Sequence, residues 1–241
     1  MSWGRSHFYQ GTRIFISRAV EQGKPVPLDV EYAPPVPTSP ECYANAHSDR
    51  INDFPETDEV LVDSRKRKNK SQDDGWRHEL DHDVESVFWL LLYWAMVMQP
   101  AEGPPGGYIN LASWVSLLGN FWDRESLVSR LSSGNPPANL THSVYEPLCP
   151  LIGNLAAILV VDRHWLEESD VRKRPEYICE AFQRLILQFI DSNRHEDFMN
   201  CRVGDFLRQA EQLPQPQALT SSSQQRDGSE RENQTKRPRL D

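Results

Sequence analysis

The sequence is poor in cysteine and has no apolar run long enough to cross a membrane. The four cysteines, Cys42, Cys149, Cys179 and Cys201, are scattered without the close pairing of a zinc ribbon or a redox motif, and no secretory signal is recognised. The longest apolar run, residues 87–98, has about 12 residues, whereas a bilayer span needs roughly 20. We therefore expect an intracellular protein, in the nucleus or the cytoplasm, with no membrane contact.

The sequence also lacks the alternation of polar and apolar residues that is typical of strands, so we predict an all-α fold. A length of 241 residues with 38% hydrophobic and 25% charged residues suits one domain with unfolded appendages. Little apolar periodicity is present in residues 33–75, which contain Pro-rich, acidic and basic stretches. We predict a largely disordered insertion there and a disordered tail at residues 214–241.

A surplus of positive charge is absent as well. The net charge of −9 argues against specific nucleic-acid binding, although two basic runs occur, at residues 65–70 and 236–239. Both runs could act as nuclear import signals, or they could only keep exposed chain solvated.

The most informative segment that is present is His82-Asp83-Val84-Glu85-Ser86, which leads into the apolar run. Its carboxylates suit a helix start, where they are stabilised by unpaired backbone amides. A helix that is apolar all round is normally buried on nearly every side, so we expect it to be the centre of the core.

Other helices are predicted from residues that recur at helical spacing. A short helix is expected at 17–22, ended by Gly23. Apolar faces then predict helices at 111–122, at 143–161 with a bent or late start because of Pro147 and Pro150, at 175–190, and at 204–213. Six tryptophans are expected to pack mainly in the core, namely Trp76, Trp89, Trp94, Trp114, Trp122 and Trp165.

Two segments together carry a resemblance to one protein family. One is the helix start His82–Ser86, followed by Phe88, Leu91, Leu92 and Trp94, and the other is Gly11-Thr12-Arg13-Ile14-Phe15-Ile16-Ser17. The first is similar to the motif that opens the buried helix of the C-terminal lobe in the fungal-type protein kinases, and the second is similar to the end of their activation loop.

The resemblance implies the helical C-terminal lobe of a kinase fold without the N-terminal β lobe. Residues 1–32 would be activation-segment-like, and residues 76–213 would be the helical lobe. Gly11 and Thr12 would belong to a substrate-loop-like segment, and His82, Asp83 and Glu85 would be structural residues at the helix start.

The sequence departs from the family in its ionic residues. The expected acidic residue falls at Ala19, unless Glu21 replaces it, and we interpret Arg172, Lys173 and Arg174 as a solvated basic turn.

The phosphate loop, the strand Lys, His-Arg-Asp and Asp-Phe-Gly are absent from the sequence. We therefore expect a truncated kinase-like chain that is inactive by itself, with ATP and Mg bound only if the missing lobe is supplied.

Two alternatives remain. The chain could be a helical interaction module, a pseudokinase remnant that binds a protein partner through the exposed surface of the lobe. It could also be a zinc metallohydrolase, because His78-Glu79-Leu80-Asp81-His82 fits a motif in which His78 and His82 bind zinc and Glu79 activates water.

Overall fold

The computed structural model describes residues 15–23, 32–61, 79–101, 121–161, 163 and 166–201. The chain divides into two units, Met1–Phe206 and Leu207–Asp241, and all described residues lie in the first. The described elements are α1 (Arg18–Gln22), β1 (Tyr32–Ala33), α2 (Glu41–Ala46), α3 (Ser48–Asp53), β2 (Val60–Leu61), α4 (Leu80–Val97), α6 (Phe121–Ser132), η3 (Ser143–Leu148), α7 (Cys149–Leu159), η5 (Val171–Lys173), α8 (Tyr177–Asn193) and α9 (Asp197–Asn200). In these residues, the only strands are the antiparallel two-residue pair β1–β2, which agrees with the predicted all-α fold. None of the described helices has the length and hydropathy to cross a bilayer.

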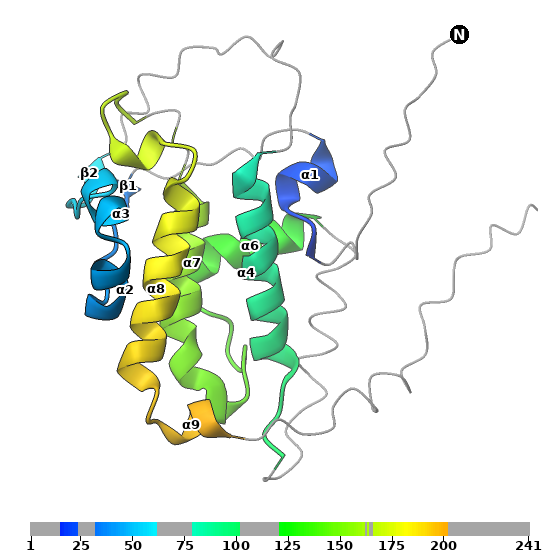
Figure 1. The fold of residues 1–241 in the computed structure, drawn as a ribbon. Helices are drawn as coiled ribbons and strands as arrows, with labels where there is room; N and C mark the ends of the chain where they lie inside the picture. The colour runs from blue at the N-terminus through cyan, green and yellow to red at the C-terminus, as the bar shows by residue number, and fades with distance from the viewer. Residues whose placement is uncertain are drawn as a thin grey trace, which may run out of the picture. The chain divides into compact units, whose positions relative to one another are not determined.

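Helices α4, α7 and α8 form the core of the described structure. Figure 1 shows α4 and α8 side by side and running in the same direction, with α7 behind them and running in the opposite direction. Helix α7 contacts α4, α6, α8 and η3. Its close contact with α6 depends on Gly153, where a Cβ atom would lie 3.2 Å from the carbonyl oxygen of Leu131. Helix α7 is therefore the helix around which the others pack.

Helix α4 does not have the burial that the sequence predicted. Its inner side is buried, but Leu80, Val87 and Leu90 expose 45%, 49% and 53% of their surface. The expectation that this helix is buried on nearly every side is wrong. Apolar composition shows which residues can be buried, but the described helices that contact α4, namely α1, α7 and α8, leave Val87 and Leu90 exposed.

Three of the predicted helices are confirmed. The helix expected at 17–22 is α1, in which the Oγ of Ser17 accepts the backbone N–H of Val20 at 3.3 Å and Gly23 ends the helix with φ 62°. The segment 143–161 forms η3 and then α7, so the two prolines do delay the α-helix. The segment predicted from 175 is α8, which begins two residues later.

Helix α6 was missed, as were the short helices α2, α3 and α9, and several predictions fall outside the described residues. Helix α6 buries Arg124, Leu127, Val128 and Leu131 at helical spacing. The arginine at the first of these positions hides the apolar stripe from a search by hydropathy. Of the helix predicted at 111–122, only the last two residues are described; the helix predicted at 204–213 and the tail lie outside the described residues.

Residues 32–61 correct the prediction of a largely disordered insertion. They form β1, α2, α3 and β2, and Ala33, Val36, Tyr43 and Phe54 are buried. The hydroxyl of Tyr43 donates to Glu180 of α8 at 2.8 Å, and burial together with this carboxylate raises the pKa of Tyr43 to about 12. The segment is ordered by its contacts with the helices rather than by a periodic pattern of its own.

Two buried arginines hold this insertion by its backbone. Nη1 of Arg172 donates to the carbonyl oxygens of Pro34 at 2.9 Å and Asp58 at 3.1 Å. The guanidinium of Arg184 binds the carboxylate of Glu180 at 2.8 Å and reaches the carbonyl oxygen of Pro37 at 3.1 Å. A guanidinium suits this task because its donors fan out in one plane.

The interpretation of residues 172–174 as a solvated basic turn is wrong for Arg172, whereas Arg174 is exposed. Arg172 is only 2% exposed and is ion-paired with Asp170 at 2.8 Å. Arg174 donates to the carbonyl oxygen of Asp53 and lies over the ring of Phe54, with 5.6 Å to its centroid. These side chains attach the insertion to the helices.

We predict that Arg184→Lys loosens residues 36–54. Lysine keeps the charge but cannot reach a carboxylate and backbone carbonyls together, so we expect a local loss of about 1–3 kcal/mol. Amide hydrogen exchange should show faster exchange in this segment. The matched control is Arg194→Lys at the end of the same helix, where the side chain is exposed. Unchanged protection in Arg184→Lys would contradict the role of this arginine.

Candidate functional site

The predicted site residues at the start of α4 are placed as helix caps and first-turn groups. Glu79 and His82 form a capping box, in which Nδ1 of His82 accepts the backbone N–H of Glu79 at 2.9 Å. Asp81 is ion-paired with Arg163. Asp83 is exposed in the first turn, where the sequence places a helix-start carboxylate.

The proposed zinc motif is only partly visible. His78 lies outside the described residues, as do Gly11 and Thr12 of the activation-loop-like segment. Within the described part of the chain, no three His, Cys, Asp or Glu side chains are grouped for a metal ion. Glu79 and His82 have a sufficient structural explanation as caps.

Glu85, the third helix-start residue, accepts hydrogen bonds from three donors in the interior. Its Oε1 accepts from the Nε of Arg18 at 2.8 Å, from the backbone N–H of Arg18 at 3.0 Å, and from the indole N–H of Trp89 at 2.9 Å. Glu85 is 6% exposed and Arg18 is 1% exposed. The sequence indicated a structural role for Glu85 but gave no indication of Arg18 as its partner.

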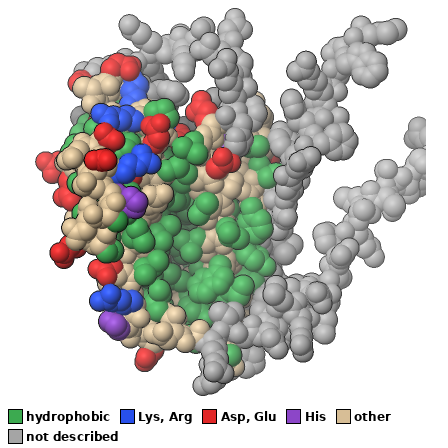
Figure 2. Space-filling model, viewed as in Figure 1, with side chains coloured by type: hydrophobic (Ala, Val, Ile, Leu, Met, Phe, Trp, Pro, Cys, Tyr) green, Lys and Arg blue, Asp and Glu red, His purple; other side chains and the backbone are tan. Residues whose placement is uncertain are grey.

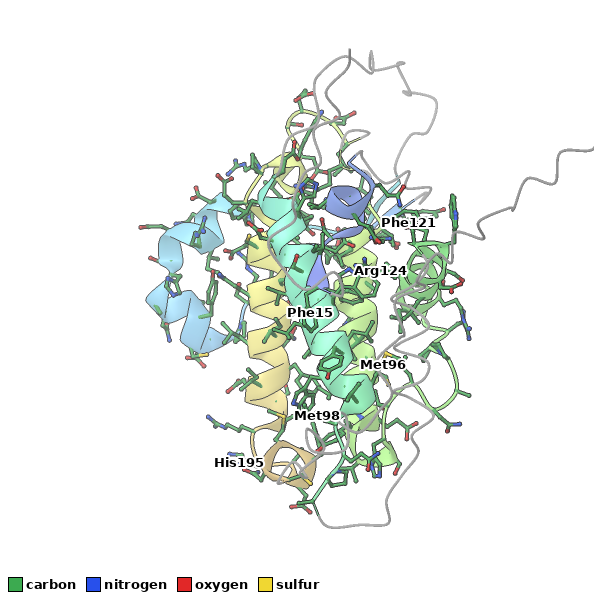
Figure 3. The ribbon with its side chains drawn as sticks, turned by 90° about the vertical axis from the view of Figure 1, so that its right-hand side faces the viewer. Phe15, Met96, Met98, Phe121, Arg124 and His195 are labelled. Carbon is green, nitrogen blue, oxygen red and sulfur yellow. The ribbon has the colours of Figure 1, made fainter. Side chains whose placement is uncertain are left out.

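A second arginine extends these contacts into a buried ionic cluster, which consists of Arg18, Glu21, Glu85, Arg124 and Glu125. Nη1 of Arg18 also binds Glu125 at 2.6 Å. Arg124 binds Glu21 at 2.9 Å and the carbonyl oxygen of Ile16 at 2.6 Å, and its guanidinium carbon lies 4.2 Å from the ring centroid of Trp89. In Figure 3, Arg124 lies between α6 and α4. The cluster joins α1, α4 and α6.

Glu21, which could replace the acidic residue expected at Ala19, is ion-paired with Arg124 of α6. Arg172 and Arg174 bind backbone carbonyls of the insertion, and Lys173 is paired with Glu168.

The cluster sets the protonation of its members. Burial alone would raise the pKa of Glu85, but the charge and hydrogen bonds of Arg18 and the hydrogen bond of Trp89 hold that pKa below its ordinary value. Burial lowers the pKa of Arg124, against the charges of Glu85 and Glu21. Because the carboxylate of Glu85 is ionised, accepts three hydrogen bonds on Oε1 and is shielded from water, it is not placed to act as a general base on a substrate.

The other distinctive feature is an apolar surface, which we call the α4–α8 face. It consists of the exposed or half-buried residues Val87, Leu90, Leu91, Trp94, Ile186 and Ile190. Their spacing puts the members of each helix on one side, and Figure 2 shows a broad hydrophobic area over α4 and α8. Charged side chains gather beside it, over α2 and α3. An exposed contiguous apolar area of this kind is typical of an interaction surface.

The tryptophans agree only partly with the expectation of core packing. Trp89 is fully buried, and Trp94 is half-buried against Tyr145 with ring centroids 5.1 Å apart. Trp122 is 69% exposed, so for this residue the expectation is wrong. Its helix turns Arg124 and Leu127 inward instead. Trp76, Trp114 and Trp165 lie outside the described residues.

A scan against protein-family models, a search of curated proteins and a search of solved structures each gave no significant match.

We predict that breaking the central ion pair destabilises the fold strongly. Glu85→Gln leaves the Arg18 charge buried beside a neutral amide, which should cost about 3–5 kcal/mol. Arg18→Met together with Glu85→Gln should cost less than the sum of the single changes, by about 1 kcal/mol or more. Chemical denaturation of the four proteins measures this coupling, with Glu168→Gln on the surface as control. Additive losses would show that the pair is not coupled.

We predict a loss of stability in acid that depends on the same pair. The pKa of Glu85 is lower in the folded than in the unfolded chain, so the folded state binds fewer protons. Its contribution is complete above the ordinary pKa of glutamate, about 4.3, and is lost as the pH falls below that value. Thermal unfolding from about pH 6 to 3 should therefore fall more steeply for the wild type than for the Arg18→Met, Glu85→Gln double variant. The pKa of Asp170 is also lowered in the folded chain, by Arg172 and despite burial, so this carboxylate adds to the loss of stability in acid. Asp170→Asn therefore serves as the control that measures how much of the loss comes from this second pair.

Proposed function

We propose that this chain is a catalytically inactive, protein-kinase-like helical module that works by binding another protein through the α4–α8 face. The observation that carries the proposal is the exposure of Val87 and Leu90 in the middle of a helix that is otherwise part of the core. Exposed apolar surface costs free energy unless another molecule covers it.

The kinase-like part of the proposal is supported by contacts between the two segments that carry the resemblance. Phe15, from the activation-loop-like segment, packs on Tyr93 of α4 with ring centroids 5.6 Å apart. Arg18, directly after that segment, binds Glu85 of the helix-start motif. Two motifs far apart in the sequence are thus joined in one place, as expected for parts of one ancestral lobe.

We infer the lack of catalysis from the groups that phosphoryl transfer requires. Phosphoryl transfer requires groups that grip the phosphates and the metal ion, and the sequence has none of the corresponding motifs. Among the described carboxylates, Glu85 is enclosed by its donors. ATP and magnesium would therefore bind only if another chain supplied the missing groups. We place the module in the nucleus or the cytoplasm, as the basic runs suggest.

We predict that the isolated protein enhances the fluorescence of a dye that binds apolar surface, and that the Val87→Gln, Leu90→Gln double variant lowers this signal. Both side chains are exposed, so their replacement should change stability by no more than about 0.5 kcal/mol each. The control is Trp122→Gln, which changes an exposed apolar residue of α6. Equal dye binding by all three proteins would count against the face as the functional surface.

The catalytic half of the proposal is tested with Mg²⁺ and ATP. A ligand that binds only the folded state raises its apparent stability, so we expect no rise in the unfolding temperature and no phosphate transfer. A clear rise would show that the chain binds the nucleotide, and labelled phosphate on a general protein substrate would show that it is an active kinase.

A further inference from the structure

The insertion begins with a proline-rich segment, residues 34–40, in which Pro34, Pro37 and Pro40 recur every three residues. This spacing is the period of a polyproline II helix, an extended conformation with no internal hydrogen bonds. Pro40 has φ −57° and ψ 146°, close to the polyproline II values. No residue from 34 to 40 belongs to a helix or a strand. The segment is therefore bound in the form in which proline-rich peptides are recognised by proteins.

Two buried arginines contact one side of this segment. Nη1 of Arg172 donates to the carbonyl oxygen of Pro34 at 2.9 Å, and Nη1 of Arg184 donates to that of Pro37 at 3.1 Å. Residues three apart in a polyproline II helix lie on the same side, one turn or about 9 Å from each other. Together, η5 and α8 thus present two donors at the spacing of one turn of such a helix.

The hydrogen-bonding groups of the arginines and of the segment are complementary. A guanidinium has only donors, and a proline has only an acceptor on its backbone. Val36 is one of only three residues from 34 to 40 with a backbone N–H, and it donates to the carbonyl oxygen of Thr57 at 3.2 Å, within the insertion. Because both arginine contacts use backbone carbonyls, another proline-rich segment can make the same contacts.

The insertion is a unit whose two ends are joined to each other. Tyr32 pairs with Leu61 and Ala33 pairs with Val60 in the β1–β2 ladder, and α2 packs on α3 within the unit. A segment closed in this way can separate from the helices while they stay folded, as in the local opening of other proteins.

The side of α8 that the insertion covers is polar. Glu180 and Arg184 are ion-paired and buried there, and the same Glu180 carboxylate binds Tyr43 at 2.8 Å and Arg50 at 3.8 Å. Figure 1 shows α2 and α3 beside α8. Water can solvate these charges when the insertion separates, whereas an apolar surface would lose free energy on exposure. The insertion is thus easier to remove than the elements that cover Phe182, which is buried in the core.

The contact between the insertion and the helices is also incomplete. Within the described residues, the hydroxyl oxygens of Ser39 and Thr57 in the insertion and of Tyr177 in α8 are buried without a hydrogen-bond partner. Burial raises the pKa of Tyr177 to about 12, against the nearby charges of Arg172 and Arg184. An unpaired buried polar group costs free energy. A segment with an acceptor for the Tyr177 hydroxyl would therefore fit this place better than the insertion does.

We propose that the polar side of η5 and α8 is a binding site for an extended proline-rich segment of another protein, and that the insertion occupies this site in the free chain. A Pro-x-x-Pro segment would replace residues 34–37, with two of its carbonyl oxygens bound by Arg172 and Arg184. The site uses residues other than those of the α4–α8 face, so the inference goes beyond the proposed function.

The test uses a labelled peptide with the sequence of residues 33–40 and follows its binding to the full chain by fluorescence anisotropy. The insertion has a high effective concentration at the site because it is part of the same chain, so the wild type should bind weakly. Phe54→Ala removes a buried ring of the insertion that lies against Arg174, outside the sequence of the peptide. This loosened variant should bind the peptide about tenfold more tightly or better. A peptide with alanine in place of every proline should bind it about tenfold more weakly than the first peptide.

Further variants locate the site. Arg184→Lys, added to Phe54→Ala, should weaken binding about tenfold, whereas adding Arg194→Lys at the exposed end of α8 should leave it within about twofold. Arg184→Lys also loosens the insertion, so tighter binding by that variant would show that Arg184 is not part of the site. Circular dichroism establishes that the variants are folded. If Phe54→Ala is not folded, Tyr43→Phe, which removes the hydrogen bond to Glu180, takes its place.

Three other results would overturn the inference. Equal peptide binding by the wild type and the loosened variant would show that the insertion does not occupy the site. Amide exchange in residues 36–54 as slow as in α4 and α7 would show that the insertion does not separate from the helices on its own. A wild-type dimer that the peptide dissociates would make a second copy, and not another protein, the source of the segment. None of these results bears on the α4–α8 face, which the dye measurement tests.

Discussion

The contact between the Glu85 carboxylate and Arg18 is the interaction on which the described fold depends. Removing two opposite charges from water costs several kcal/mol for each ion, and the pair offsets this only if further donors satisfy the carboxylate. Here the backbone of Arg18 and the indole of Trp89 supply them. The same arginine reaches Glu125 of α6, so one buried carboxylate links the short helix α1 to both α4 and α6.

The insertion is held by a related arrangement on the other side of the bundle. Arg172 and Arg184 direct donors at backbone carbonyls of residues 34–58, which lie more than 100 positions earlier in the sequence. Backbone carbonyls are present whatever the side chains are, so this kind of anchoring leaves no periodic pattern in the insertion. The two arginines determine which carbonyl oxygens of the insertion are bound, and the Pro-rich segment supplies a chain that is already extended.

This difference explains how much could be predicted from the sequence. Helices α7 and α8 could be predicted from Leu, Ile and Phe residues at helical spacing, because this period indicates that one side of a helix is buried. The order of residues 32–61 and the inward position of Arg124 could not be predicted in this way, because they depend on partners distant in the sequence. Glu85 was singled out through its motif, whereas the exposed strip of α4 was not, since a helix that is apolar all round has no pattern that shows which side is covered.

The ionic cluster also explains why that strip is exposed at all. A helix of nearly uniform apolarity can rotate about its axis with little change in the apolar area that it buries. Glu85 and Trp89, one turn apart, remove this freedom because the carboxylate must meet Arg18 in the interior. Once their side of α4 is fixed inward, Val87, Leu90 and Trp94 lie on the opposite side. The buried ion pair thus selects which apolar residues of α4 are exposed, so one interaction determines both the inner and the outer side of this helix.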